Sequence, residues 1–552
     1  MQKDCTRRGF LKGAGVLCAG TTLAAMAGCA PAQPQDKAAS TTLGATGDAA
    51  PVWETAPEPI ADDQITETVQ ADVVIVGAGI AGNVAAMAAA EAGLSAVVLQ
   101  KLDRVANYGT GVASYDCRKQ KEMGAPDKYD VSELLSLYMS QGVNMPDRRF
   151  MEMWVRRSGA DCDWLYDLLE EEMGEPQWTW DEPEPIMGMY DMIAAMAALA
   201  EKAQAAGVEY RFSTPAVQLE REEGGRVTAV IAMNDDDEYL KFEAGKAVLL
   251  CAGDYGHNDE MRAHWMPHAE GFASPVEPAW NTGDGDLMAM WVGAAMDKAP
   301  HASNIHYDCV DYTLDQVWGS GKPGLRVNQN GERFSNEDVV YGLIPIQDAA
   351  QPGCMHYDIF DNTYEQTHTQ LGTGLYNDAP PAETFYPTFL EYLDGKGIDH
   401  SSMSDFQAML EAHVQLGTML RADSLDELAQ LADIPADALK ATVERYNELA
   451  AKGVDEDFGK DGKLLFPIKE PPFYAVARHA FSLSCLQGLT INLDSQVLDA
   501  EGKVIPGLYA CGNNSGGNWI AGPVQPMCIP GVPTARAIIT ARVAIEAVAA
   551  GK

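Results

Sequence analysis

The sequence predicts an α/β fold built on a strand–turn–helix–strand unit. An apolar run at 73–76 suits a buried strand, and it ends in a turn that contains Gly77, Gly79 and Gly82. An alanine-rich stretch follows, and a second apolar run occupies 96–99. Apolar strands on both sides of a helical stretch are typical of a parallel sheet covered by helices. With 552 residues, the chain is long enough for more than one domain.

The glycine spacing in this unit predicts a dinucleotide site. Gly77 permits a tight turn, Gly79 lets the backbone approach a pyrophosphate, and Gly82 allows the helix to pack closely on the strand. Phosphate charge would then face the free N–H groups of the helix N-terminus. The second strand is followed by Gln100, where an acidic residue would hold the ribose hydroxyls. An amide oxygen can still accept a hydrogen bond, so we expect an uncharged contact there.

The composition is that of a globular protein with an unusually acidic surface. The formal net charge is −41, from 80 acidic and 39 basic residues. Such a charge argues against binding to nucleic acid or to an anionic membrane surface. It favours a solvated acidic surface, and docking of a basic electron carrier is the alternative.

The N-terminus is expected to be a targeting signal rather than part of the folded protein. Residues 6–12, with Arg7 and Arg8, form a twin-arginine export signal, and the apolar stretch after them is too short for a good membrane span. We therefore expect signal residues 1–29 and a periplasmic or other extracytoplasmic location. Cys29 closes a possible lipoprotein cleavage site, so a lipid anchor and soluble release near Ala32 both stay open.

Residues 30–69 are expected to be a disordered linker, because they are rich in Ala, Pro, Thr and acidic residues and have no hydrophobic periodicity. The 11 cysteines show no C-x-x-C motif and no haem attachment motif, so no metal, cluster or haem is predicted. Periodicity predicts helices and strands in the rest of the chain. The expected helices are 131–141, 148–172, 189–206, 404–416, 424–431, 435–452 and 534–548, and the expected strands lie within 217–230, 239–242 and 247–253.

Five motifs in a fixed order resemble the flavoprotein family of fumarate reductases, L-aspartate oxidases and ketosteroid dehydrogenases. They are a strand that ends in a turn at 252–256, similar to an Ala-Thr-Gly-Gly-Phe turn, and the segments 281–286, 331–337, 471–475 and 507–512. Together they cover about residues 70–550. The resemblance implies FAD as the cofactor, and a Rossmann-like FAD-binding domain with an inserted α+β clamp domain. Mapped onto this chain, the FAD-binding domain is 70–297 plus 470–552, and the clamp is 298–469.

The resemblance also assigns residues to the cofactor. The C-terminal helix is expected to direct its N-terminus at the flavin, with Asn513, Asn514 and Gln525 as flavin contacts or as ordinary loop caps. The full expected FAD-binding set is Gly77, Gly79, Ile80, Ala81, Gly82, Gln100, Lys101, Gly109, Thr110, Gly111, Val217, Ala252, Gly253, Asp284, Gly512, Asn513 and Gln525.

Three catalytic candidates follow from the same resemblance. Tyr341 stands where family fumarate reductases carry an arginine acid, four residues after Glu337, and a phenol with a reference pKa near 10 can donate a proton. His306 lies near the family's substrate-binding histidine, although a structural histidine is an equal alternative. Arg333 is a nearby cation that is expected to order its loop through Glu337.

Other fumarate-specific positions depart from the family pattern. The expected histidine pair is replaced by residues 482–488, and the expected carboxylate-binding arginine falls within 522–529, which contains no arginine. Without those cations a dicarboxylate would be poorly held. We therefore expect a bulky or aromatic substrate with one activating carbonyl, near Pro523, Met527 and Ile529.

The function expected from these features is reduction of an activated C=C bond by an exported FAD enzyme, with electrons from an external protein donor, as in anaerobic respiration. One alternative is the reverse reaction, a dehydrogenase of the ketosteroid type. A second is a noncatalytic flavoprotein that relays electrons. The sequence does not determine the substrate, the donor or the oligomeric state.

Overall fold

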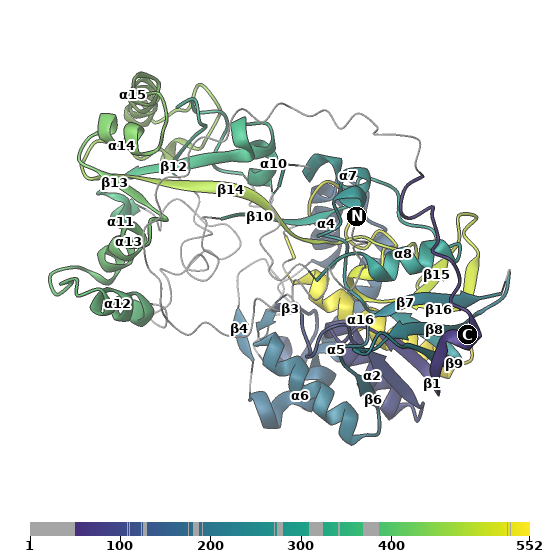
Figure 1. Cartoon of the computed structure of the whole chain (residues 1–552). Coiled ribbons are helices and arrows are strands. Elements are labelled where there is room, and N and C mark those ends of the chain that lie inside the picture. Colours follow the sequence, from purple (N-terminus) through teal and green to yellow (C-terminus); the bar gives the residue numbers. More distant parts are fainter. Residues whose placement is uncertain are drawn as a thin grey trace, which may run out of the picture.

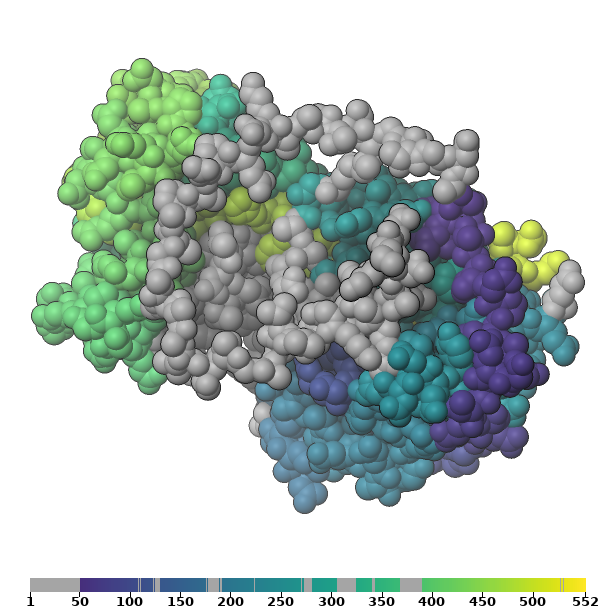
Figure 2. Space-filling model, viewed as in Figure 1, coloured from purple at the N-terminus to yellow at the C-terminus, as the bar shows by residue number. Residues whose placement is uncertain are grey.

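The structure is a computed structural model, and it describes residues 50–107, 109, 111–122, 124, 130–174, 176–179, 187–189, 191–222, 224–269, 271–272, 280–308, 324–339, 343–367, 386–526, 528–529 and 531–552. Figure 1 shows two bodies joined by a long ribbon of two strands, β10 and β14. In Figure 2 the green surface of about residues 390–460 lies on one side of the molecule and the purple and blue surface on the other. The expected α/β class is confirmed.

The larger body is organised around an eight-stranded sheet with the order β15-β16-β9-β1-β2-β6 and the hairpin β7–β8 attached to β9. The pairs β16/β9, β9/β1, β1/β2 and β2/β6 are parallel. The strands are β1 (Ile65–Val76), β2 (Ala96–Leu99), β6 (Glu209–Arg211), β7 (Ala216–Arg221), β8 (Val227–Met233), β9 (Tyr239–Leu250), β15 (Gln496–Leu498) and β16 (Val504–Ala510).

The helices of this body pack on each other and on the sheet. α2 (Ile80–Glu91) contacts both α16 (Val532–Ala549) and α6 (Met192–Ala205), and α16 also contacts α5 (Arg148–Met173). The small side chains of α2 permit this close packing, and Val73, Val74 and Ile75 beneath it are completely buried. The other elements are η1 (Asp62–Gln64), β3 (Gly111–Ala113), α3 (Arg118–Glu122), α4 (Val131–Gln141), β4 (Gln177–Thr179), β5 (Met187–Met189), α7 (Asp259–Trp265), η3 (Pro267–Ala269), α8 (Asp284–Trp291) and η8 (Gly512–Asn514).

The smaller body contains a five-stranded antiparallel sheet with the order β10-β14-β12-β11 and β13 paired with β14. Its strands are β10 (Ser303–Asp308), β11 (Leu325–Val327), β12 (Met355–Asp361), β13 (Leu420–Ala422) and β14 (Phe473–Cys485). The helices around it are α10 (Ile344–Ala349), η5 (Pro352–Cys354), α11 (Tyr364–Thr367), α12 (Tyr386–Gly395), α13 (Asp405–Leu416), α14 (Leu425–Leu431), α15 (Ala436–Lys452) and η7 (Gly462–Leu464).

The helix boundaries follow local capping. Asp191 accepts hydrogen bonds from the amides of Ile193 and Ala194, so α6 begins at Met192 rather than at the expected residue 189. Ser404 and Ser424 are N-caps of α13 and α14, one residue before each helix begins. The other expected helices agree with the structure to within two residues.

Three sequence-based expectations are corrected. The two strands expected at 239–242 and 247–253 form one strand, β9, because β1 pairs along its whole length. The expected boundary between residues 469 and 470 would place all of β14 in the larger body. The Phe473–His479 half of β14, however, pairs with β12 of the smaller body. Sheet pairing therefore continues across that division.

The third correction concerns the expected disordered linker, 30–69. Residues 65–69 belong to β1, and residues 50–64 lie on the main body. The Trp53 ring is 4.6 Å from the Trp265 ring, and Trp291 Nε1 donates to the Val52 carbonyl at 3.0 Å. An aromatic side chain and backbone hydrogen bonds fix this segment although its composition is typical of disorder.

Candidate functional site

A cavity of about 280 Å³ opens where the parallel strands of the main sheet end. Residues that follow β1, β2, β9 and β16 line it, and so do the first turns of α2 and α16. Ligands of open α/β sheets bind at this edge, because the strand ends and the helix N-termini meet there. Asn304 of β10 and Ser484 of β14 also reach the cavity, so the strand ribbon from the smaller body forms part of its wall.

The glycine turn has the geometry that a pyrophosphate requires. Gly77 has φ +107°, and a side chain there would lie 2.2 Å from the Cys251 carbonyl oxygen. Gly82 approaches the strand so closely that a Cβ would lie 1.8 Å from the Gly77 carbonyl oxygen. Gly79 is the N-cap of α2 and has no side-chain cap, and a Cβ there would meet only the Ala106 carbonyl, at 3.5 Å. The N-terminal amides of α2 therefore face open space that suits a phosphate.

The next strand end supplies the nucleoside side of the cavity. Gln100 is buried and donates from Nε2 to the Arg104 carbonyl at 2.9 Å, so its Oε1 is the group that can accept a ribose hydroxyl. Lys101 is engaged by protein groups: its ammonium donates to the Trp280 carbonyl, to Thr282 Oγ1 at 3.2 Å and to Asp284 at 3.2 Å. This lysine ties the β2 end to the segment before α8.

Most residues of the expected FAD-binding set lie around this one cavity. Gly82 and Val217 do not line it: Gly82 acts through helix packing, and Val217 follows the lining residues Pro215 and Ala216. Thr110 lies outside the described residues. The members that line the cavity are Gly77, Gly79, Ile80, Ala81, Gln100, Lys101, Gly109, Gly111, Ala252, Gly253, Asp284, Gly512, Asn513 and Gln525.

The expected contact of the C-terminal helix with the site has a structural basis, since Pro533 and Thr534 in the first turn of α16 line the cavity. Asn514 is different from its neighbour Asn513. It is fully buried, donates to Asp286 at 3.0 Å and accepts from the Ala252 amide at 2.6 Å. These contacts give Asn514 a structural role, whereas Asn513 and Gln525 face the cavity.

Many lining residues are absent from the expected set, and the polar ones among them include Asn281, Asn304 and Ser484. Asn304 and Ser484 are register partners on β10 and β14, so they lie side by side although 180 positions separate them. No local pattern predicts such a pair. Asn281 belongs to the family-like segment 281–286, but the sequence analysis predicted no role for the Asn281 side chain.

The described part of the structure does not show the three catalytic candidates together in one site. Tyr341 lies outside them. The backbone of His306 pairs with Phe481 in the ribbon, and the His306 side chain is outside the description. Arg333 is absent from the cavity lining and lies in the smaller body. Its expected role in ordering the loop fits its contacts, and these contacts do not support a catalytic role.

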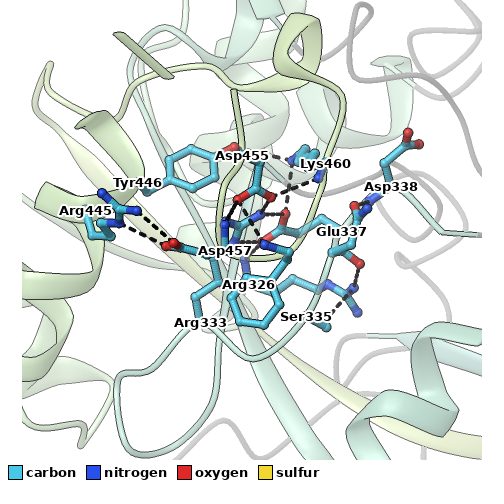
Figure 3. A network of polar contacts seen from close by, with 12 residues as sticks. Arg326, Arg333, Ser335, Glu337, Asp338, Arg445, Tyr446, Asp455, Asp457 and Lys460 are labelled. Carbon is cyan, nitrogen blue, oxygen red and sulfur yellow. Dashed lines mark hydrogen bonds and ion pairs between the residues drawn. The ribbon is translucent and has the colours of Figure 1, made fainter. Parts of the chain in front are cut away.

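Figure 3 shows the ion network that holds Arg333. The guanidinium donates to both oxygens of Glu337 at 2.8 Å and to Asp455 at 2.8 and 3.0 Å, and it stacks on the ring of Phe458. Lys460 approaches Glu337 to 3.3 Å. Burial pushes the Glu337 pKa up, but Lys460 and Arg333 outweigh burial and hold that pKa below its usual value.

No helix among the described residues is both long and apolar enough to cross a bilayer. Within the same residues, no group of three or more His, Cys, Asp or Glu is arranged to hold a metal ion.

Comparison with known proteins places these features in a family. The FAD binding domain family matches residues 176–528, and the FAD dependent oxidoreductase family matches residues 72–279. Vinyl phenol reductase of Lactiplantibacillus plantarum is 27% identical over 465 residues, which cover 81% of this chain and 90% of that protein. A 3-oxosteroid 1-dehydrogenase of Mycobacterium tuberculosis is 26% identical, covering 83% and 94%.

Among solved structures, the open conformation of a flavocytochrome c3 fumarate reductase superposes with a TM-score of 0.65. That match has 22% sequence identity and covers 90% of this chain and 82% of the other, so it establishes the shared fold. The glycine turn, the open helix N-terminus and the enclosing cavity agree with the family's cofactor. The chain therefore belongs to the FAD binding domain family and is an FAD-dependent oxidoreductase of the fumarate reductase and ketosteroid dehydrogenase group.

Proposed function

We propose that the protein reduces an activated C=C bond in a bulky or aromatic α,β-unsaturated carbonyl or carboxylate compound other than fumarate. The observation that carries the proposal is the neutral polar lining contributed by Asn304, Ser484 and Gln525, with Leu483 beside them. Among the described lining residues the only Lys, Arg or His is Lys101, and Asp284 pairs with its ammonium. A site of this kind can hydrogen-bond one carbonyl oxygen but lacks cations for two carboxylates.

Bound FAD would supply the hydride, from flavin N5. The protein has to hold the substrate carbonyl, exclude water and deliver a proton. Asn304, Ser484 and Gln525 line the cavity with groups that can donate a hydrogen bond to a carbonyl oxygen on which negative charge develops. For proton delivery we propose Tyr341, because Glu337, four residues before it, is anchored in the buried ion network with Arg333.

The names of two relatives support a bulky substrate without a pair of carboxylates. A vinyl phenol and a 3-oxosteroid both lack the paired carboxylates of fumarate. The neutral side chains of the lining suit such molecules. An aromatic or polycyclic enone or enoate is therefore the substrate class that we propose.

The 3-oxosteroid 1-dehydrogenase relative also supports a second candidate, introduction of a C=C bond. Both reactions would use the same cavity in opposite directions. Stopped-flow mixing distinguishes them. Reoxidation of reduced flavin by enoates or enones supports the reductase, and reduction of oxidised flavin by saturated ketones supports the dehydrogenase.

Three further parts of the proposal concern the cellular setting and the domains. Residues 1–29 would direct twin-arginine export, with Cys29 as a possible lipid attachment site, and an external carrier would supply electrons. The net charge of −41 favours a basic carrier protein. The division into a flavin domain and an inserted clamp, joined through β10 and β14, also remains a proposal.

The test is an anaerobic screen of unsaturated acids, enones and steroids with reduced viologen as the electron donor. With an active substrate in hand, Tyr341→Phe should lower turnover by about 10²- to 10⁴-fold, the usual contribution of a general acid. Tyr357→Phe is the control, because the Tyr357 hydroxyl donates to the Ala432 carbonyl within the smaller body. Full turnover in Tyr341→Phe would remove that residue as the acid. The proposed direction would be reversed if no compound oxidised the reduced viologen, while saturated ketones were oxidised in a parallel assay with an oxidised electron acceptor in its place.

A further inference from the structure

One buried carboxylate joins four separate segments of the cofactor cavity. Asp254 follows Gly253 at the end of β9 and is 1% exposed. In the sequence it lies within the glycine-containing turn at 252–256. A charge buried this deeply is stable only when hydrogen bonds or counter-charges satisfy it, so its partners are informative.

Within the described part of the chain, the hydrogen-bond partners of Asp254 are neutral donors. Its Oδ2 accepts from Asn281 Nδ2 at 3.0 Å and from Asn513 Nδ2 at 3.1 Å, and its Oδ1 accepts from the Gly256 amide at 2.8 Å. The backbone amide of Cys485 also faces this carboxylate and acts to lower its pKa. These donors come from the loop before α8, from η8, from the turn after β9 and from the end of β14.

The same segments line the cofactor cavity, through Gly253, Asn281, Ser484 and Asn513. Because Asp254 accepts from their NH₂ groups, both amide side chains have a fixed orientation. The Asn281 oxygen then lies over Gly253, where a Cβ would come within 2.8 Å of it. Asn281 therefore offers an acceptor at the cavity wall, as a cofactor hydroxyl requires.

A buried cation supports the ionised form of Asp254. Arg536 of α16 is fully buried, and its Nη2 donates to Asn513 Oδ1 at 2.6 Å. Asn513 thus lies between a guanidinium and a carboxylate, with one end of its amide bonded to each. An ionised carboxylate only accepts hydrogen bonds, whereas a protonated one must donate and would lose at least one of its N–H partners.

We propose that Asp254, in its ionised form, is a positioning residue of the FAD site that sets the orientation of Asn281 and Asn513 and ties the end of β14 to the cavity wall. FAD affinity should then depend on the protonation state of Asp254. Burial raises the pKa of Asp254 to about 6, which places this dependence in an accessible range.

Other ionisable groups around Asp254 behave differently over that range. Arg536 stays charged, since burial lowers its pKa only to about 10. Burial raises the pKa of Asp286 on α8 well above its ordinary value, and it also raises the pKa values of Tyr255 and of Cys485 on β14. Tyr255 and Cys485 therefore stay neutral between pH 5 and 8. Asp286 is the remaining ionisable group of this set, so the pH experiment needs a matched control at that residue.

The experiment is a titration of flavin-free full-length protein with FAD, followed by flavin fluorescence, between pH 5 and 8. In the wild type, affinity should fall as the pH drops below about 6, approaching tenfold per pH unit, because only the ionised carboxylate accepts every donor. Asp254→Asn should bind FAD about ten- to a hundredfold more weakly at pH 7.5 and should lose the pH dependence.

Asp286→Asn is the control, because that buried acid bonds to Asn514, which does not line the cavity. It should keep both the affinity and the pH profile of the wild type. If Asp254→Asn does not fold, Asp254→Gly takes its place. A flat wild-type profile overturns the proposal without any variant, and so does wild-type affinity in Asp254→Asn or an equal loss in Asp286→Asn.

Discussion

Replacement of Arg333 by leucine tests whether the ion network of the smaller body stabilises the fold. The change leaves two carboxylates, Glu337 and Asp455, without the guanidinium that bonds to both of them. Both carboxylates are completely buried, and the Arg333 side chain is only 6% exposed. Lys460 remains 3.3 Å from Glu337, so part of the charge is still compensated.

The expected loss is about 3–5 kcal/mol, the cost of removing one partner from a buried ion pair. For a domain of about 150–250 residues, 1 kcal/mol shifts the melting temperature by about 2–4 °C. Arg333→Leu should therefore lower the unfolding temperature of the smaller body by roughly 6–20 °C in calorimetry at pH 7. Arg445→Leu is the matched control, because its pairs with Asp457 and Glu448 are exposed to solvent, and it should melt close to the wild type.

The loss should also depend on pH in a defined direction. In the wild type, Lys460 and Arg333 hold the pKa of Glu337 below its usual value, and Arg333 with backbone amides does the same for Asp455, in both cases against burial. The stability that these carboxylates contribute is complete above their unfolded pKa values, near 4, and is lost as the pH falls through the folded values. The gap between wild type and Arg333→Leu should therefore narrow as the pH falls below about 4. A variant that melts like the wild type, or a gap that does not change with pH, would refute this account.

Two further predictions concern glycine packing and thiol exposure. Gly79→Ala should fold, because its Cβ would meet only the Ala106 carbonyl oxygen at 3.5 Å. It should nevertheless lose visible flavin absorbance, because Gly79 lines the cavity. Gly82→Ala should lose both folding yield and flavin, since its Cβ would lie 1.8 Å from the Gly77 carbonyl oxygen. If both variants purify with full flavin, the assigned cavity is wrong. Among the seven cysteines within the described residues, only Cys354 is partly exposed. A thiol reagent followed by peptide mapping should therefore label Cys354 first, and Cys354→Ser should abolish this fast labelling. Faster labelling of another cysteine in that set would contradict the packing.

Local sequence determined the elements around the nucleotide because their signals lie within a few residues. The glycines at 77, 79 and 82 act on one turn, and the aspartate and serine caps fix the starts of α6, α13 and α14. The length of β9 was not predictable in this way. Its weakly apolar middle is held as a strand because β1 lies beside it over the whole length.

The sequence by itself determined the α/β class, the glycine turn for a dinucleotide and part of the set of residues that surround the cavity. Tertiary structure alone decided that Asn304 meets Ser484 across two strands, that Arg333 is held in a buried ion network instead of lining the cavity, and that Asp254 draws Asn281 and Asn513 together. The physical reason is the range of the interactions. Turns and caps depend on neighbouring residues, whereas strand register and buried charge pairing join groups that lie far apart along the chain.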